Sequence, residues 1–176
     1  IWDVDDPQSP VRLSSVLVYY SGTDSDQPTD GLYVTGDLLY INANEARVHA
    51  FNISDPAHPV DLGVQAGPLW YNHYDRDTDD VAVAGGYAYV SGDGIAKFLI
   101  RPDGTLDKVG EYLNASSVTC IEVQGPYAYA GAPEALGVFD VSSSYPSMVG
   151  SVAVSGGLND LALTGTSVVA VNRNGL

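Results

Sequence analysis

The sequence has a single cysteine, few basic residues and no long apolar run, and each shortage excludes a class of protein. One cysteine, Cys120, among 176 residues leaves no internal disulfide. Only 7 lysines and arginines stand against 22 aspartates and glutamates, and the net charge is −15. Such a surface repels nucleic acid and anionic membranes. No run approaches the roughly 20 apolar residues of a membrane-spanning helix.

Residues that favour long helices are also scarce. Methionine occurs once, whereas Gly (19), Pro (10) and Tyr (12) are plentiful. No apolar run with the helical period extends beyond about two turns. Because hydrophobic residues still make up 45% of the chain, the composition favours a folded domain of short strands and tight turns. The first residues, Ile-Trp-Asp, hold neither Met nor a signal peptide, so we expect a processed chain or part of a longer one.

One phrase occurs four times along the chain. It reads LYVTGDLLYINA from Leu32, VAVAGGYAYVSG from Val81, IEVQGPYAYAGA from Ile121 and LALTGTSVVAVN from Leu161. The copies align without a gap, and a glycine occupies the same position in each: Gly36, Gly85, Gly125 and Gly165. Each copy alternates apolar and polar residues on both sides of that glycine. This pattern predicts a β-hairpin in each copy.

A third and a fourth predicted strand follow the hairpin. The third has an aromatic residue at its centre (Phe51, Phe98 or Phe139), and the fourth contains a matching glycine (Gly63, Gly110 or Gly150). Four antiparallel strands repeated about every 40–50 residues predict the blades of an all-β propeller. The expected blades cover about residues 32–66, 81–113, 121–155, and 161–176 together with 1–18. We take residues 1–176 as a single β-propeller domain or as a segment of a larger protein.

The two ends of the sequence correspond to different halves of a blade. The opening IWDV matches a third strand, since Trp2 aligns with Phe51 and Phe139, and the closing VAVNRNGL ends after a second strand. We therefore expect the ends to share one sheet, which would hide both edges. Two arrangements stay open: a closed four-bladed ring, or part of a larger ring or tandem array.

A second recurring phrase, of the form SDPxxP, marks the turn after the third strand. An Asp or Ser side chain there accepts a hydrogen bond from the backbone N–H two residues further on. The first proline ends the strand. The second (Pro10, Pro59 or Pro146) begins the outermost strand, where a missing donor faces solvent. We interpret the phrase as scaffold chemistry.

These phrases resemble those of the LVIVD-repeat β-propellers. The resemblance lies in GGYAYVSG, GPYAYAGA, FNISDPAHPVDLG and IWDVDDPQSPV, and it covers nearly the whole chain except two acidic loops. The third copy departs from the pattern, with IRPDGT in place of VSDPxxP. The resemblance implies a secreted or cell-surface propeller, often one module of a larger protein, and supplies no catalytic residues.

Two acidic loops are candidate calcium sites. One carries Asp75, Asp77 and Asp79 at alternate positions with Asp80 beside them, and the other carries Asp24, Asp26 and Asp30. Calcium prefers six to eight oxygen ligands, which clustered carboxylates supply. The EF-hand pattern is absent, because the distant bidentate Glu is missing. The alternative is a solvated acidic loop.

Other candidate sites are weaker. Asn52 and Asn114 begin glycosylation sequons. Among the histidines (His49, His58 and His73) no two have metal-ligand spacing, and only His73 lies near a carboxylate cluster. Cys120 is expected to be a small core residue. The tyrosines at repeat positions (Tyr33, Tyr87, Tyr89, Tyr127 and Tyr129) could stack on carbohydrate, but we expect them to pack between blades.

Three functions fit these observations. The first is a non-enzymatic extracellular or cell-surface module for display, adhesion or assembly, whose partners are other copies of itself, surface proteins or glycans. The second is a self-associating filament subunit. The third is a propeller enzyme, a hydrolase or lyase, with its site at the central channel. The residues expected there are Gly31, Asp80, Cys120 and Asp160, which give an enzyme little support.

Overall fold

The computed structural model describes residues 1–16, 18, 31–43, 47–66, 80–113 and 117–172. Within these residues all regular structure is β, in sixteen strands without a helix. None of them therefore forms a helix long and apolar enough to cross a membrane.

Three four-stranded antiparallel sheets follow one another along the chain. We name them the first, second and third units. The first unit consists of β3 (Leu32–Thr35), β4 (Leu38–Ala43), β5 (Arg47–Asn52) and β6 (Val60–Ala66). The second consists of β7 (Val81–Ala84), β8 (Tyr87–Ser91), β9 (Gly94–Ile100) and β10 (Leu106–Leu113). The third consists of β11 (Cys120–Gln124), β12 (Tyr127–Ala132), β13 (Ala135–Asp140) and β14 (Ser147–Ala153).

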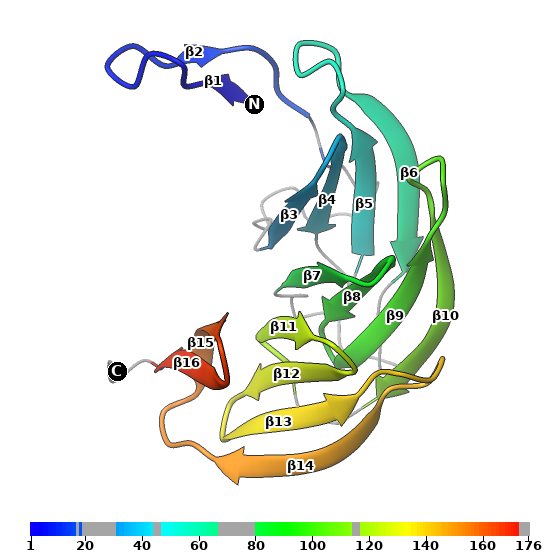
Figure 1. Ribbon diagram of the computed structural model, residues 1–176, viewed down its shortest axis with the longest axis vertical. Coiled ribbons are helices and arrows are strands. Elements are labelled where there is room, and N and C mark those ends of the chain that lie inside the picture. The colour runs from blue at the N-terminus through cyan, green and yellow to red at the C-terminus, as the bar shows by residue number, and fades with distance from the viewer. Residues whose placement is uncertain (17, 19–30, 44–46, 67–79, 114–116, 173–176) are drawn as a thin grey trace, which may run out of the picture.

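Two further hairpins flank the three units. The outer hairpin pairs β1 (Trp2–Asp3) with β2 (Val11–Arg12), and the inner hairpin pairs β15 (Leu158–Thr164) with β16 (Ser167–Asn172). All these elements are arranged along an arc, with the first strand of each unit on the concave side and the fourth on the convex side (Figure 1). The arrangement is all-β, repetitive and propeller-like.

The expectation that the two ends share one sheet is wrong within this chain. The outer and inner hairpins are separate two-stranded sheets, and they lie far apart at the two ends of the arc (Figure 1). Local contacts hold each in place. Ser14 Oγ donates to the Pro56 carbonyl at 2.5 Å beside the first unit, whereas Leu158 and Leu161 of the inner hairpin pack against Cys120 of the third.

Glycines set two recurrent features of each unit. The glycines that align the four copies have φ of 54°, 58°, 59° and 59°, in the left-handed region that a tight hairpin turn requires. The matching glycines of the fourth strands, Gly63, Gly110 and Gly150, each lie directly after a residue skipped in the pairing with the third strand. A β-bulge therefore recurs in every unit and bends the outermost strand.

The hydrogen bonds predicted for the SDPxxP turn are confirmed. Asn52 Oδ1 accepts the Ser54 N–H at 2.9 Å, and Asp55 Oδ1 accepts the Ala57 N–H at 3.0 Å. The outer hairpin has the same two bonds, from Asp5 to Asp3 at 2.9 Å and from Gln8 to Asp6 at 3.0 Å. In each case the strand after the second proline begins at the next residue.

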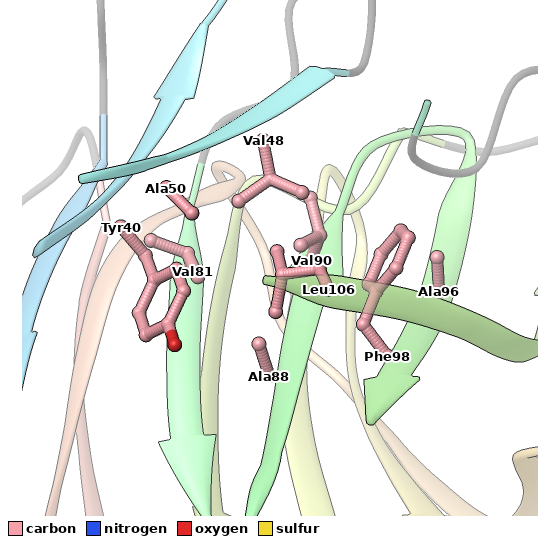
Figure 2. Close-up of a cluster of buried hydrophobic side chains, with 9 residues drawn as sticks. All are labelled: Tyr40, Val48, Ala50, Val81, Ala88, Val90, Ala96, Phe98 and Leu106. Carbon is pink, nitrogen blue, oxygen red and sulfur yellow. The ribbon is translucent and has the colours of Figure 1, made fainter. Parts of the chain in front are cut away.

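The core lies between units rather than within them. Figure 2 shows one cluster in which Tyr40, Val48 and Ala50 of the first unit meet side chains of the second. Phe98 in that cluster is fully buried, and Phe139 has the same place between the second and third units. Each unit thus buries its apolar faces against its neighbours, as stacked repeats do.

Candidate functional site

Asp80 lies directly before β7, at the start of the second unit. Its Oδ1 accepts the N–H of Val81 at 2.8 Å, and its Oδ2 accepts the N–H of Ile121 at 3.0 Å. Because Val81 begins β7 and Ile121 lies in β11, one carboxylate joins the second unit to the third. Burial raises the pKa of Asp80 to about 6, since desolvation outweighs these two donors, and the nearby Asp160 and Glu122 charges add to the rise.

The first unit also converges on Asp80. Asn42 Nδ2 donates to the Asp80 carbonyl at 3.1 Å. A Cβ on Gly31 would lie 2.7 Å from the Asp80 Cα, so only glycine allows the two strands this approach. Asp80 therefore contacts the first, second and third units. Its described contacts hold the three units together.

Cys120, at the matching position of the third unit, is buried as expected. Burial raises the pKa of its thiol to about 11, which leaves it neutral at physiological pH. Beside it, the Thr119 hydroxyl donates to the Leu158 carbonyl of the inner hairpin. The Thr119 bond therefore connects the third unit to the inner hairpin. The Cys120 thiol is a poor nucleophile, because it is neutral and buried.

A buried lysine, which the sequence analysis missed, joins the second and third units. Lys97 is 3% exposed, and its Nζ donates to the carbonyls of Val141 at 2.6 Å and Ser143 at 2.9 Å. The Nζ also lies 4.2 Å from the Tyr87 ring centroid, a cation–π distance. Burial lowers the pKa of Lys97, and Asp140 acts in the opposite direction. The repeat alignment contained one signal for this lysine. Lys97 aligns with Ala50 of the first unit, so a charged residue stands where another unit has a small apolar one.

Most of the predicted calcium ligands lie outside the described residues: Asp24, Asp26, Asp30, Asp75, Asp77 and Asp79. Asp80 is described, and backbone N–H groups occupy both of its oxygens. The structure brings no three His, Cys, Asp or Glu side chains into a metal-binding group among the residues it describes.

The remaining predicted site residues are spread over the fold. Asn114 lies outside the described residues, and Asn52 is half-buried at the end of β5. His49 is buried and stacked with Phe51, with ring centroids 6.3 Å apart, and desolvation lowers its pKa. His58 pairs with Asp55 at 2.9 Å in an exposed turn. His73 lies outside the described residues. Tyr89 is buried between the second and third units as expected, but the same expectation is wrong for Tyr127, which is 42% exposed.

The raised pKa of Asp80 predicts a pH dependence of stability. The folded state binds this proton more tightly than the unfolded chain, so the contribution of Asp80 is complete below 3.8 and is lost as pH rises through about 6. The expected loss is on the order of 2–3 kcal/mol. Urea unfolding at pH 4.5, 6 and 7.5 measures it, and Asp80→Asn should flatten the profile. Asp5→Asn, which removes an exposed carboxylate, is the control. If the free energy of unfolding changed with pH equally in wild type and Asp80→Asn, Asp80 would not be the group that causes the pH dependence.

Comparison with protein families gives one match. The family model described as LVIVD repeat matches residues 75–96 and 115–156. These ranges contain β7, β8 and all four strands of the third unit. No curated protein matches the chain significantly.

Several solved structures share the fold. The computationally designed Ika4 protein superposes with a TM-score of 0.67 at 12% identity, over 93% of this chain and 95% of that one. The designed Ika8 protein gives 0.62 at 13% identity, over 82% of this chain and 43% of that one. The structure of U3-55K gives 0.63 at 13% identity, over 85% of this chain and 47% of that one. The chain thus spans less than half the length of the last two, and identities this low concern the fold alone.

Proposed function

We propose that this chain, of which residues 75–96 and 115–156 match the LVIVD repeat model, is a non-enzymatic β-propeller module of an extracellular or cell-surface protein, acting in display, adhesion or assembly. In this proposal each unit is one propeller blade. The radial order of the units and the apolar clusters between them support the assignment (Figures 1 and 2).

The main support for a role in adhesion or assembly is the exposed surface of β14, on the convex side of the arc. All seven residues of this strand, Ser147–Ala153, are exposed. Its apolar side chains include Met148, Val149 and Val152, which are 47%, 57% and 63% exposed. Exposed apolar side chains grouped on one strand are a typical protein contact surface. By contrast, Asp80, Cys120 and Lys97 are used between units, which favours a scaffold over a catalyst.

Adhesion is tested with beads coated with the chain. We expect the beads to bind intact cells of the source organism, and Val149→Asp with Val152→Asp to reduce binding about tenfold or more, because apolar anchors dominate contact energies. Val60→Asp, on the exposed face of β6, is the matched control. An unchanged melting temperature would show that the variants fold. Equal binding by the β14 variant and wild type would contradict this role for β14.

We also propose that the acidic loops of residues 21–31 and 74–80 bind calcium. Their aspartates supply oxygen ligands, and a net charge of −15 attracts cations. Calcium at about 100 times its dissociation constant should stabilise the fold by about 2.7 kcal/mol. The measurement is the melting temperature during a calcium titration, with magnesium as control. No change in melting temperature would remove the proposal, and Asp75→Asn with Asp77→Asn should abolish any change.

Self-association is the second candidate function, favoured by the two hairpins at the ends of the arc. Each hairpin forms a two-stranded sheet, whereas each complete unit has four strands. If each copy paired with a different neighbour at each end, the product would be an open filament.

A further inference from the structure

The fourth strand of each unit is the last strand of its sheet, on the convex side of the arc (Figure 1). Among the described residues, β6, β10 and β14 each pair only with the third strand of their own unit. A further unit follows β6 and β10 along the chain and still leaves their outer edges open, because neighbouring units pack face to face. Such an edge presents main-chain N–H and C=O groups that can pair with another strand.

The edge strand β14 lacks the charges that protect the other two edges. β6 contains Asp61, and β10 contains Asp107, Lys108 and Glu111, whereas β14 (SMVGSVA) contains no charged residue. Charged side chains on an edge strand hinder its pairing with a foreign strand. All seven residues of β14 are exposed, so its neutral edge is accessible. Among the three fourth strands, β14 is therefore the one best suited to accept a further strand.

The pairing of β14 with β13 shows which of its main-chain groups point outward. The N–H of Val154 donates to the Glu134 carbonyl at 2.9 Å, so these two residues, which continue the β13–β14 register, form a hydrogen-bonded pair. Hydrogen-bonded and non-hydrogen-bonded pairs alternate along an antiparallel ladder. Counting back along the register, Ser151 and Ala153 belong to non-hydrogen-bonded pairs. Their N–H and C=O groups therefore point away from β13, toward the open edge.

The charge around β14 determines which kind of partner it attracts. Between Lys108 and Arg173 the sequence has no lysine, arginine or histidine. The same stretch has five acidic residues: Glu111, Glu122, Glu134, Asp140 and Asp160. Asp140 lies opposite Ser147 at one end of β14, and Glu134 bonds Val154 beyond the other end. A second copy of this chain carries the same negative charge and is repelled, whereas a basic segment is attracted.

We infer that β14 binds an extended segment of a partner protein, in which apolar residues alternate with lysine or arginine, as a further strand of the third unit. Main-chain bonds to Ser151 and Ala153 supply affinity. Because side chains alternate between the faces of a sheet, the apolar residues of the segment lie on one face and the basic ones on the other. Val152, 63% exposed, offers an apolar contact. This inference rests on the contact role proposed for β14 and names the chemistry of its partner.

Peptide binding tests strand addition to β14. The probe is a fluorescently labelled synthetic peptide as long as β14, in which valine and lysine alternate, added to the full 176-residue chain. We expect saturable binding, measured by fluorescence anisotropy, that weakens as the salt concentration rises. A peptide in which valine and glutamate alternate has the same strand pattern with the opposite charge. Its dissociation constant should be higher by about tenfold or more.

Two variants of Ser151 locate the binding site. Ser151→Pro removes one outward N–H and leaves the pairing with β13 in place, so the dissociation constant of the valine–lysine peptide should rise about tenfold. Val64→Pro is the matched control, because Val64 follows Gly63 in β6 as Ser151 follows Gly150, and it should leave binding unchanged. Ser151→Lys keeps the main chain intact and should weaken binding by charge repulsion. An unchanged melting temperature would show that each variant folds.

Other outcomes would overturn the inference. Equal binding by wild type and both folded Ser151 variants would place the peptide elsewhere on the molecule. Equal binding of the lysine and glutamate peptides would overturn the basic partner, as would no binding of the valine–lysine peptide. A dimer of the chain, seen by light scattering and abolished by Ser151→Pro, would replace the partner segment with a second copy.

Failure of this inference differs from failure of the proposed function. If coated beads bound cells through β14 but the valine–lysine peptide did not bind, the contact role would stand and the basic partner strand would be wrong. If the peptide bound at Ser151 but the beads did not bind cells, strand addition would stand and the role in adhesion would be wrong.

Discussion

Phe98→Ala is expected to lower the free energy of unfolding by about 3–5 kcal/mol, the largest effect of any single side chain considered. Phe98 is fully buried between the first and second units, within a cluster that also contains Tyr40, Val48 and Leu106 (Figure 2). Removal of the ring leaves a cavity that strands of two sheets border, and hydrogen bonding within each sheet limits collapse. Urea unfolding followed by circular dichroism measures the loss.

Two comparisons make the Phe98 prediction specific. Val152→Ala, on the exposed strand β14, should change the free energy of unfolding by less than about 0.5 kcal/mol. Phe98→Leu retains part of the volume and should cost less than Phe98→Ala. If Phe98→Ala were as stable as Val152→Ala, the clusters between units would not be the core, and the propeller-like packing would be contradicted.

Lys97→Met is expected to destabilise the protein by about 2–4 kcal/mol. The methionine keeps most of the apolar stem but leaves the carbonyls of Val141 and Ser143 without their donor. The buried Val141 carbonyl left without a partner costs about 1–3 kcal/mol, whereas the Ser143 carbonyl, in an exposed turn, costs less because water can reach it. The cation–π contact with Tyr87 is lost as well. Denaturant unfolding at neutral pH measures the effect.

Lys108→Met is the matched control for Lys97. Lys108 is also a lysine of the second unit, but its pair with Glu111 is one-third exposed, so its loss should cost less than about 1 kcal/mol. A Lys97→Met variant as stable as Lys108→Met would show that Lys97 does not join the second and third units.

Local features of the fold were predictable because they depend on short stretches of chain. Gly36 and its counterparts mark the hairpins, since a tight turn requires positive φ. Asp55 and Pro59 mark the turn into the outermost strand, because an Asx bond and a missing donor act within a few residues. The repeated aromatics predicted a common buried position, which Phe51, Phe98 and Phe139 occupy.

Contacts between units were not predictable in the same way. In the sequence Lys97 is only a charged residue within a predicted strand. The structure is needed to show the two carbonyls that accept hydrogen bonds from its Nζ. Asp80 was grouped with the calcium candidates because it follows Asp79, yet it faces the backbone of β11. The placement of the two hairpins depends on the angle between units, which periodicity does not encode. The expected shared sheet within one chain was wrong for this reason.

The central claim is that each unit packs on its neighbours, because the core lies between units rather than within them. The measurement is a double-mutant cycle by urea unfolding, with Val48→Ala in the first unit and Val90→Ala in the second, two fully buried side chains of one cluster (Figure 2). We expect the losses of the two single variants and of the double variant to differ from additivity by at least about 0.5 kcal/mol, because side chains that share a packed cluster are coupled. Strictly additive losses would show that the two units do not share a core and would contradict the claim.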